Sequence, residues 1–97
     1  MTDDNLLWLL NWYYSQCDED WEHGNSIKIG TIDNPGWYLK VSIDETELKN
    51  KKFEKIKIDR TEHDWISCFV ENGIFNGFGG SFNLPEILQI FRNWLEI

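Results

Sequence analysis

The sequence predicts an α+β domain in which an N-terminal and a C-terminal helix pack on one face of an antiparallel sheet of four or five strands. Apolar residues recur with helical spacing near both ends of the chain and with strand spacing between them. Connections of hairpin length favour a meander, and two apolar helices need a sheet face to cover. With 97 residues, 41% of them hydrophobic, we expect a single domain over residues 1–97.

The first predicted helix is apolar round much of its circumference. The stripe expected to face the core recurs at i, i+3, i+4 and i+7, and consists of Leu6, Leu9, Leu10 and Tyr13. Leu7, Trp8 and Trp12 lie off this stripe. The helix is therefore either buried between other elements or partly in an interface, and we favour burial. A side chain within residues 2–4 is expected to cap its start.

A hairpin is expected in the segment that follows. Apolar and polar residues alternate over residues 27–31 and again over 37–44, which is the pattern of half-buried strands. Between them, Pro35 and Gly36 suit the central positions of a type II turn. The two strands are therefore predicted to pair with each other.

The second half of the chain predicts further strands and the last helix. A strand over residues 53–60, with Ile56 and Ile58 inward, is followed by a strand over 65–71 that is apolar on both faces. An Asn-Gly turn then leads to a short strand over 74–78.

A glycine-rich stretch, NGFGGSFN, precedes the final helix. Its glycines lack the spacing of a nucleotide-binding loop, so we expect them to serve backbone conformations with positive φ. Asn83 is expected to cap the last helix in a capping box with Glu86. The apolar face of this helix consists of Leu84, Leu88, Phe91 and Leu95.

The charge of the chain limits its partners. A formal net charge of −8 disfavours binding to nucleic acid, because such proteins neutralise phosphates with Lys and Arg. It favours a basic protein partner, whose encounter an acidic surface accelerates, or serves solubility alone. Residues 1–27 hold six acids and no Lys or Arg. The N-terminal third therefore carries most of the negative field.

The chain shows no sign of export or of a membrane span. Acids precede the first short apolar run, which is unlike a signal peptide, and no apolar stretch is long enough to cross a bilayer. We therefore expect a cytoplasmic protein with no membrane partner, in which Cys17 and Cys68 are reduced thiols.

The stretch QCDEDWEHG, residues 16–24, concentrates ligand-type side chains. Its spacing matches neither paired zinc ligands nor a calcium loop, so we predict no metal and no cofactor. Cys17 with His23 or His63, and Asp20 with Glu22, are conceivable catalytic pairs, but no supporting motif accompanies them. We predict a protein that is not an enzyme. A small metal- or thiol-dependent enzyme is the alternative.

The same stretch has the features of a partner-binding loop. It combines clustered acids with an indole between a helix and a strand. Trp21 is expected either to anchor a partner or to turn inward as a plug, and the inward orientation is favoured. A further alternative is a self-associating module that uses Trp8 and Trp12, so we expect a monomer or a homodimer.

Three segments of the chain match the pattern of a known family: LLWLLNWYYSQCDEDWEH, IKIGTIDNPGWYLKVSI and NLPEILQIFRNWL. They resemble the immunity protein 53 family of bacterial polymorphic toxin systems. The resemblance extends from Leu6 to about Leu95 and is weakest across residues 44–64. The chain departs from the family pattern in two places. The family has a Gly where this chain has Glu19, and it has a Tyr-Gly pair near the position of Asn25 and Ser26.

The resemblance implies a cytoplasmic antidote that binds and neutralises the toxic domain of a cognate toxin. Many toxin domains of such systems are basic nucleases, to which an acidic surface would be steered. We predict the contact region to be Asp18, Glu19, Asp20, Trp21, Glu22 and His23, followed by the outward acids Asp44, Glu45 and Glu47.

Overall fold

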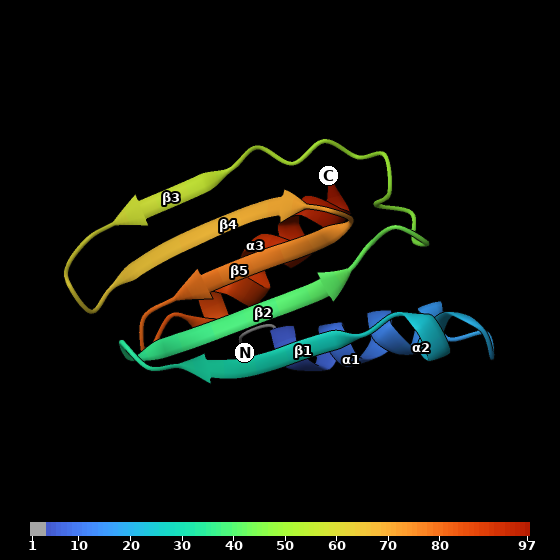
Figure 1. Ribbon diagram of the computed structural model, residues 1–97, viewed down its shortest axis with the longest axis horizontal. Helices are drawn as coiled ribbons and strands as arrows, with labels where there is room; N and C mark the ends of the chain where they lie inside the picture. Colours follow the sequence, from blue (N-terminus) through green and yellow to red (C-terminus); the bar gives the residue numbers. More distant parts are fainter. Residues whose placement is uncertain (1–3) are drawn as a thin grey trace.

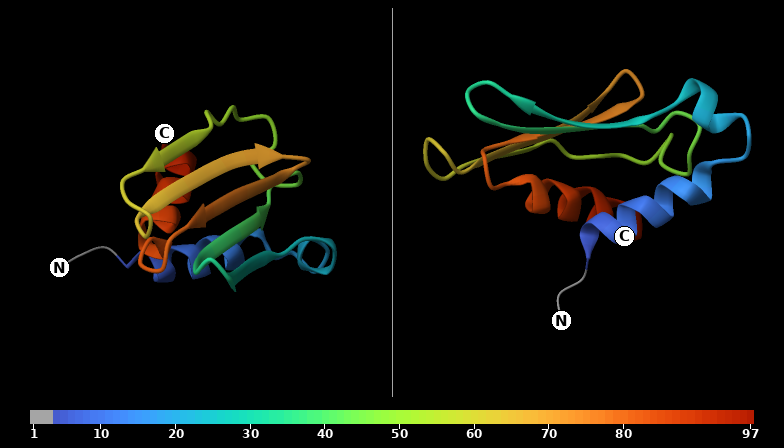
Figure 2. Two further views of the ribbon diagram at one scale, coloured as in Figure 1. Left: turned by 60° about the vertical axis from the view of Figure 1, so that its left-hand side comes forward. Right: turned by 90° about the horizontal axis from the view of Figure 1, so that it is seen from below.

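The computed structural model describes residues 4–97 and shows a five-stranded antiparallel sheet with its long helices on one face (Figures 1 and 2). The helices are α1 (Asn5–Gln16), the short α2 (Trp21–Gly24) and α3 (Leu84–Glu96). The strands are β1 (Ile27–Ile32), β2 (Gly36–Ser42), β3 (Ile56–Asp59), β4 (Trp65–Glu71) and β5 (Ile74–Gly79). The predicted α+β class, with a helix near each end of the chain, is confirmed.

The strand order is β1-β2-β5-β4-β3, so the predicted meander is wrong. β1 and β2 form one hairpin, β3 to β5 form a three-stranded meander, and β5 pairs with β2 to join them. Residues 43–55 connect β2 to the far edge of the sheet (Figure 1). The rule of hairpin neighbours fails here because this connection is too long for a hairpin.

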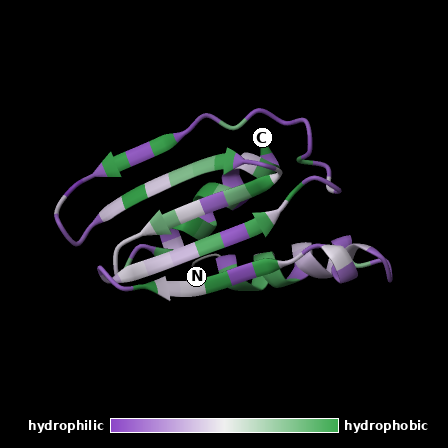
Figure 3. Cartoon of the chain, viewed as in Figure 1, coloured by the Kyte–Doolittle hydropathy of each residue, from purple (hydrophilic) through white to green (hydrophobic). Residues whose placement is uncertain are grey.

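β3 is shorter than the predicted strand over residues 53–60. It begins at Ile56 and ends at Asp59, and its apolar and polar residues alternate (Figure 3). Ile56 and Ile58 pack against the core as predicted. Phe53 stays out of the sheet because its ring packs between Phe75 and Trp94, with centroid distances of 5.3 and 5.1 Å.

α1 presents a different face to the core from the one predicted. Its buried residues are Leu9 and Trp12, and Trp8 packs beside them. Leu6 and Leu10, which were expected inside, are 50% and 55% exposed. The indoles lie inward because they contact the Phe91 ring of α3, at 5.9 Å for Trp8 and 5.3 Å for Trp12, and large rings bury the most apolar area.

The start of α1 is capped within the expected range. The Asp4 carboxylate accepts a hydrogen bond from the Leu7 amide at 3.0 Å, which satisfies one of the helix's unpaired amides. Residues 2 and 3, the other expected caps, lie outside the described residues.

Most of the glycines allow close packing and do not adopt the left-handed backbone conformation. Among the described glycines only Gly73 has positive φ, at 75°, so the type II turn at Gly36 and the left-handed loop after β5 are wrong. A Cβ on Gly36 would strike the carbonyl oxygen of Gly79, and one on Gly77 would lie 2.5 Å from Ile87. These contacts let β2 and α3 approach β5. The predicted Asn-Gly turn between β4 and β5 is confirmed, since Asn72 also has positive φ.

The predicted capping box at α3 does not form. Asn83 occupies the N-cap position, but its side chain makes no capping hydrogen bond to the helix. Its amide oxygen accepts instead from the Gly80 amide at 3.1 Å, and its amide nitrogen reaches the Asp64 carboxylate at 2.9 Å. Asn83 therefore ties the helix to the strands rather than closing the helix end.

Replacing Gly36 should test the close-packing role of the glycines. We expect Gly36→Ala to lower the free energy of unfolding by roughly 1–3 kcal/mol, because the added methyl group overpacks the β2–β5 pair. Gly24→Ala is the matched control: nothing lies within 4 Å of a Cβ there, and alanine favours α2, so stability should stay equal or rise by up to ~1 kcal/mol. Equal stability of both variants in urea denaturation would contradict the close-packing role.

Candidate functional site: an acidic end beside an apolar groove

Two acidic segments that are distant in the sequence meet at one end of the molecule, where α2 lies in Figure 1. The Asn25 side chain donates to Glu45 at 3.1 Å, and the Gln16 side chain donates to Glu47 at 3.2 Å. The Trp12 indole N–H reaches Glu47 at 3.4 Å. We call residues 18–23 and 44–47 the acidic end. The structure therefore brings both predicted groups of contact residues together.

Two of its carboxylates hold the backbone of the loop. Asp18 accepts hydrogen bonds from the amides of Asp20 (3.0 Å) and Trp21 (2.9 Å). Glu22 accepts from the amides of Asp18 (3.1 Å) and Glu19 (2.9 Å). The bonds from the Trp21 and Asp20 amides lower the pKa of Asp18, because they favour its ionised form. Asp18 and Glu22 therefore have a structural role.

Glu19, Asp20 and His23 are exposed at the tip of this loop. Glu19 has φ of 77°, a left-handed conformation that costs a non-glycine residue about 1–2 kcal/mol. The chain therefore accepts backbone strain to place a carboxylate here.

Trp21 is the one predicted contact residue that the structure withdraws from solvent. Its side chain is 3% exposed and packs edge-on against Trp12 and Tyr13, with centroid distances of 6.4 and 5.9 Å. Of the two orientations weighed for Trp21, the inward one, which the sequence analysis favoured, is confirmed. Its indole N–H has no hydrogen-bond partner, so its contribution is apolar packing.

The second acidic segment surrounds the end of β2. Glu45 and Glu47 are exposed but linked to Asn25 and Gln16. Asp44 is exposed and lies beside the β4–β5 turn. Its carboxylate occupies the space that a Cβ on Gly73 would need. The Ile43 amide donates to the Gly73 carbonyl at 3.0 Å, which fixes the turn against this segment.

An apolar groove adjoins the acidic end and was not predicted. Its volume is about 400 Å3, and it lies between α1 and the edge strand β1. Its walls are Leu6, Leu9, Leu10, Tyr13, Glu22, Asn25, Ser26, Ile27 and Ile29. The groove exists because α1 turns its two indoles inward and leaves the leucine side facing outward. The sequence did not show which face of α1 lies inward, because this helix is apolar on nearly every side.

Of the conceivable catalytic residues, His63 lies apart from the others. His63 lies on the β3–β4 turn, at the end of the sheet opposite α2 (Figure 1). The Cys17 thiol contacts the Tyr13 carbonyl at 3.4 Å. Cys68 is fully buried, and burial raises the pKa of its thiol to about 12. Among residues 4–97 no three His, Cys, Asp or Glu side chains are grouped as metal ligands.

The two indoles named in the self-association alternative, Trp8 and Trp12, lie toward the core. Trp12 is buried, and Trp8 packs against Phe91 with the Arg92 guanidinium 5.6 Å from its ring. Trp12 is therefore part of the core, and Trp8 is half-buried against it.

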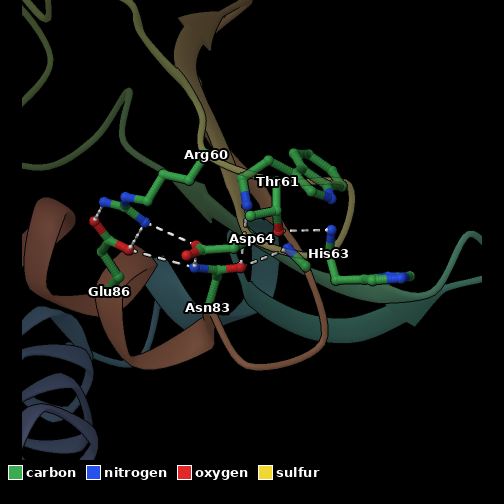
Figure 4. Close-up of polar contacts among 8 residues, drawn as sticks. Arg60, Thr61, His63, Asp64, Asn83 and Glu86 are labelled. Atoms are coloured by element: carbon green, nitrogen blue, oxygen red, sulfur yellow. Dashed lines mark hydrogen bonds and ion pairs between the residues drawn. The ribbon is translucent and has the colours of Figure 1, made fainter.

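A polar cluster at the opposite end was not foreseen from the sequence (Figure 4). The Arg60 guanidinium contacts both carboxylate oxygens of Glu86, at 3.0 and 2.6 Å, and Asp64 at 2.8 Å. Asn83 bridges to Asp64 at 2.9 Å. Hydrogen bonds from Asn83 and Arg60 lower the pKa of Asp64, and Arg60 lowers that of Glu86. This cluster joins the β3–β4 turn to α3, and its groups satisfy one another.

The fold and the site define a small α+β domain that carries a carboxylate-rich loop beside an apolar groove. The chain belongs to the Immunity protein 53 family, whose model matches residues 6–96. No curated protein and no solved structure matches the chain. Within residues 4–97, none of the helices combines the length and apolar character needed to cross a bilayer.

The inward position of Trp21 leads to a stability test. We expect Trp21→Ala to lower the free energy of unfolding by about 3–5 kcal/mol, because it leaves a cavity between α1 and α2. Trp21→Phe should cost clearly less, since it keeps much of the ring and removes a buried N–H that has no partner. Chemical denaturation followed by circular dichroism measures both, and an unchanged Trp21→Ala would refute the packing role.

The polar cluster leads to a prediction about pH. The folded-state pKa values of Asp64 and Glu86 are depressed, so their contribution to stability is present above the unfolded-state values, near pH 4, and is lost as pH falls through the folded-state values. Arg60→Gln should therefore lower the melting temperature most at neutral pH and least at pH 2–3. Lys52→Gln is the control, because the Lys52–Glu54 pair is fully solvated, at 85% and 84% exposure. A gap between wild type and Arg60→Gln that does not change with pH would contradict this.

Proposed function

We propose that this protein is an antitoxin that binds the toxic domain of a cognate polymorphic toxin and neutralises it through the acidic end. Membership of an immunity-protein family across residues 6–96 carries the proposal. The protein partner, the acidic contact surface and a cytoplasmic site of action are parts of this proposal. A binding role needs no reactive centre, which agrees with a site built from carboxylates and apolar side chains.

The charges of the acidic end favour a basic toxin surface. Six exposed acids lie on it: Asp18, Glu19, Asp20, Asp44, Glu45 and Glu47. Complementary charge accelerates encounter and orients the partner. A nuclease domain that binds phosphates with Lys and Arg presents such a surface, and a carboxylate-rich inhibitor competes for the same cations. We therefore propose a basic nuclease as the class of toxin.

The adjoining groove supplies the apolar part of the interface. Charged rims give specificity and rate, whereas affinity depends mainly on a few buried apolar or aromatic anchors. Glu22 lines the groove and also holds the acidic loop, so the two surfaces are continuous. We propose that an apolar side chain of the toxin, flanked by Lys or Arg, enters the groove between Leu10 and Ile29. A second copy of this chain is a poor occupant, because it would bring another acidic end to the same place.

Glu19 separates binding from stability. We expect Glu19→Gly to raise the free energy of unfolding by ~1 kcal/mol, because glycine relieves the left-handed strain, and yet to weaken toxin binding. Glu19→Lys should weaken binding further, mainly through a slower association rate. Glu62→Lys is the control, since Glu62 is 89% exposed at the other end of the sheet. Surface plasmon resonance with the toxin domain measures the rates, and equal losses for Glu19→Lys and Glu62→Lys would exclude the acidic end as the contact.

The overall role is tested with the toxin encoded by the adjacent gene. Co-expression should give a stable complex at low salt and protect cells from that toxin. If the two proteins do not associate and the chain gives no protection, the proposed function is wrong. Survival without a complex would also reject neutralisation by binding.

A further inference from the structure

The face of the sheet that the helices leave uncovered has its own composition. Both long helices lie on the opposite face, and no described element covers this one (Figure 2). The strand registers align three half-buried aromatic residues at its centre: Tyr38 pairs with Phe78, and Phe69 pairs with Asn76 beside them. The exposed lysines on either side are Lys28, Lys40, Lys55 and Lys57. Although the chain has a net charge of −8, this face is basic and aromatic.

One pair of these lysines disfavours folding. Lys28 and Lys40 are directly opposite each other in the β1–β2 ladder, and like charges in such a position destabilise a sheet. Lysines on edge strands often prevent unwanted strand pairing, which accounts for Lys28 and Lys57. It does not account for Lys40, because β2 is an interior strand. Alternation accounts for a polar residue at position 40, but it does not account for a lysine directly opposite Lys28.

The lysines and the rings are arranged together. The Lys40 ammonium lies 5.8 Å from the centroid of Phe78, and the Lys55 ammonium lies 6.0 Å from that of Phe69. The two rings stack, with centroids 6.2 Å apart and an interplanar angle of 23°. A ring face attracts an ammonium that lies within about 6 Å of its centroid. The face thus presents cations around an apolar centre.

We propose that this open face, centred on Lys40, Phe69 and Phe78, is a second docking surface, which takes an acidic protein segment with carboxylates around one apolar or aromatic side chain. The lysines pair with the carboxylates, and the apolar side chain covers the stacked rings. The proposal does not depend on what the acidic end binds, because the two surfaces carry opposite charge and lie on different parts of the molecule.

The observations favour an acidic protein segment over single-stranded nucleic acid. A nucleic-acid groove offers a continuous track of cations. Here Glu71 and Asp59 interrupt the lysines at the borders of the face. A net charge of −8 also repels a polyanion at long range.

The test uses the full chain labelled with 15N and a short peptide of Asp and Glu residues around one phenylalanine. At low ionic strength we expect shifts of the amide signals of β2, β4 and β5 around the three central residues. Combining Lys40→Glu with Lys57→Glu should lower the affinity for the peptide about tenfold or more. Lys52→Glu, the same charge change off this face, should not. Lys40→Glu alone should keep or raise the melting temperature, because it turns the Lys28 contact into an attraction.

Four outcomes would overturn the proposal. They are an absence of shifts on this face, an equal loss of affinity in Lys52→Glu, equal shifts with a peptide in which Lys replaces the acids, and tighter binding of oligothymidylate than of the acidic peptide. The last result would assign the face to nucleic acid. A thermal melt of the double variant as well as of Lys40→Glu ensures that lost binding is not caused by unfolding.

Discussion

The packing of α1 and the sheet on the Phe91 ring decides most of the other features of this molecule. Trp12 and Phe75 contact this ring from the two sides, at centroid distances of 5.3 and 5.0 Å. Because the indoles of α1 fill this contact, its leucine side faces outward. The apolar groove and the exposed leucines are therefore a consequence of how the core is filled, and they need no separate cause.

The same packing connects the core to the acidic end. Trp12 contacts Phe91 on one side and Trp21 on another, and its N–H reaches Glu47. The acidic loop is thus supported by an indole that is itself part of the core. The Asp18 and Glu22 carboxylates accept hydrogen bonds from the loop backbone. The carboxylates of Glu19 and Asp20 are therefore not needed to hold the loop. Rigid support beneath exposed carboxylates reduces the entropy lost when a partner binds.

Local patterns predicted the parts of the fold that depend on local interactions. The hairpin of β1 and β2, the strand over residues 65–71 and the Asn-Gly turn follow from alternation and turn chemistry. The strand order does not, because it depends on where the connection over residues 43–55 leads. The glycine roles were mistaken because a close approach between β2 and β5 is a tertiary contact that no single segment records.

The site was predicted to a similar extent and for similar reasons. The sequence identified the acids at 18–23 and 44–47, but their meeting depends on side chains such as Asn25 that carry no recognisable signal. The inward face of α1 was not predictable because the helix is apolar on nearly every side, so the fit to α3 decides. The Arg60–Glu86 pair joins residues 26 positions apart, and nothing in either segment marks the other.

The charges of this chain are separated in space more than in sequence. The net value of −8 describes a protein with carboxylates at one end and lysines across the open face of the sheet. Folding creates this separation, because period-two alternation sends Lys28, Lys40 and Lys57 to the face away from the helices. Salt at moderate concentration limits the range of electrostatic interactions to about 10 Å. A partner therefore interacts with the charges of the local surface rather than with the net charge. Net charge is therefore a guide to partners only at low ionic strength, and at moderate salt each surface has to be judged by its own residues.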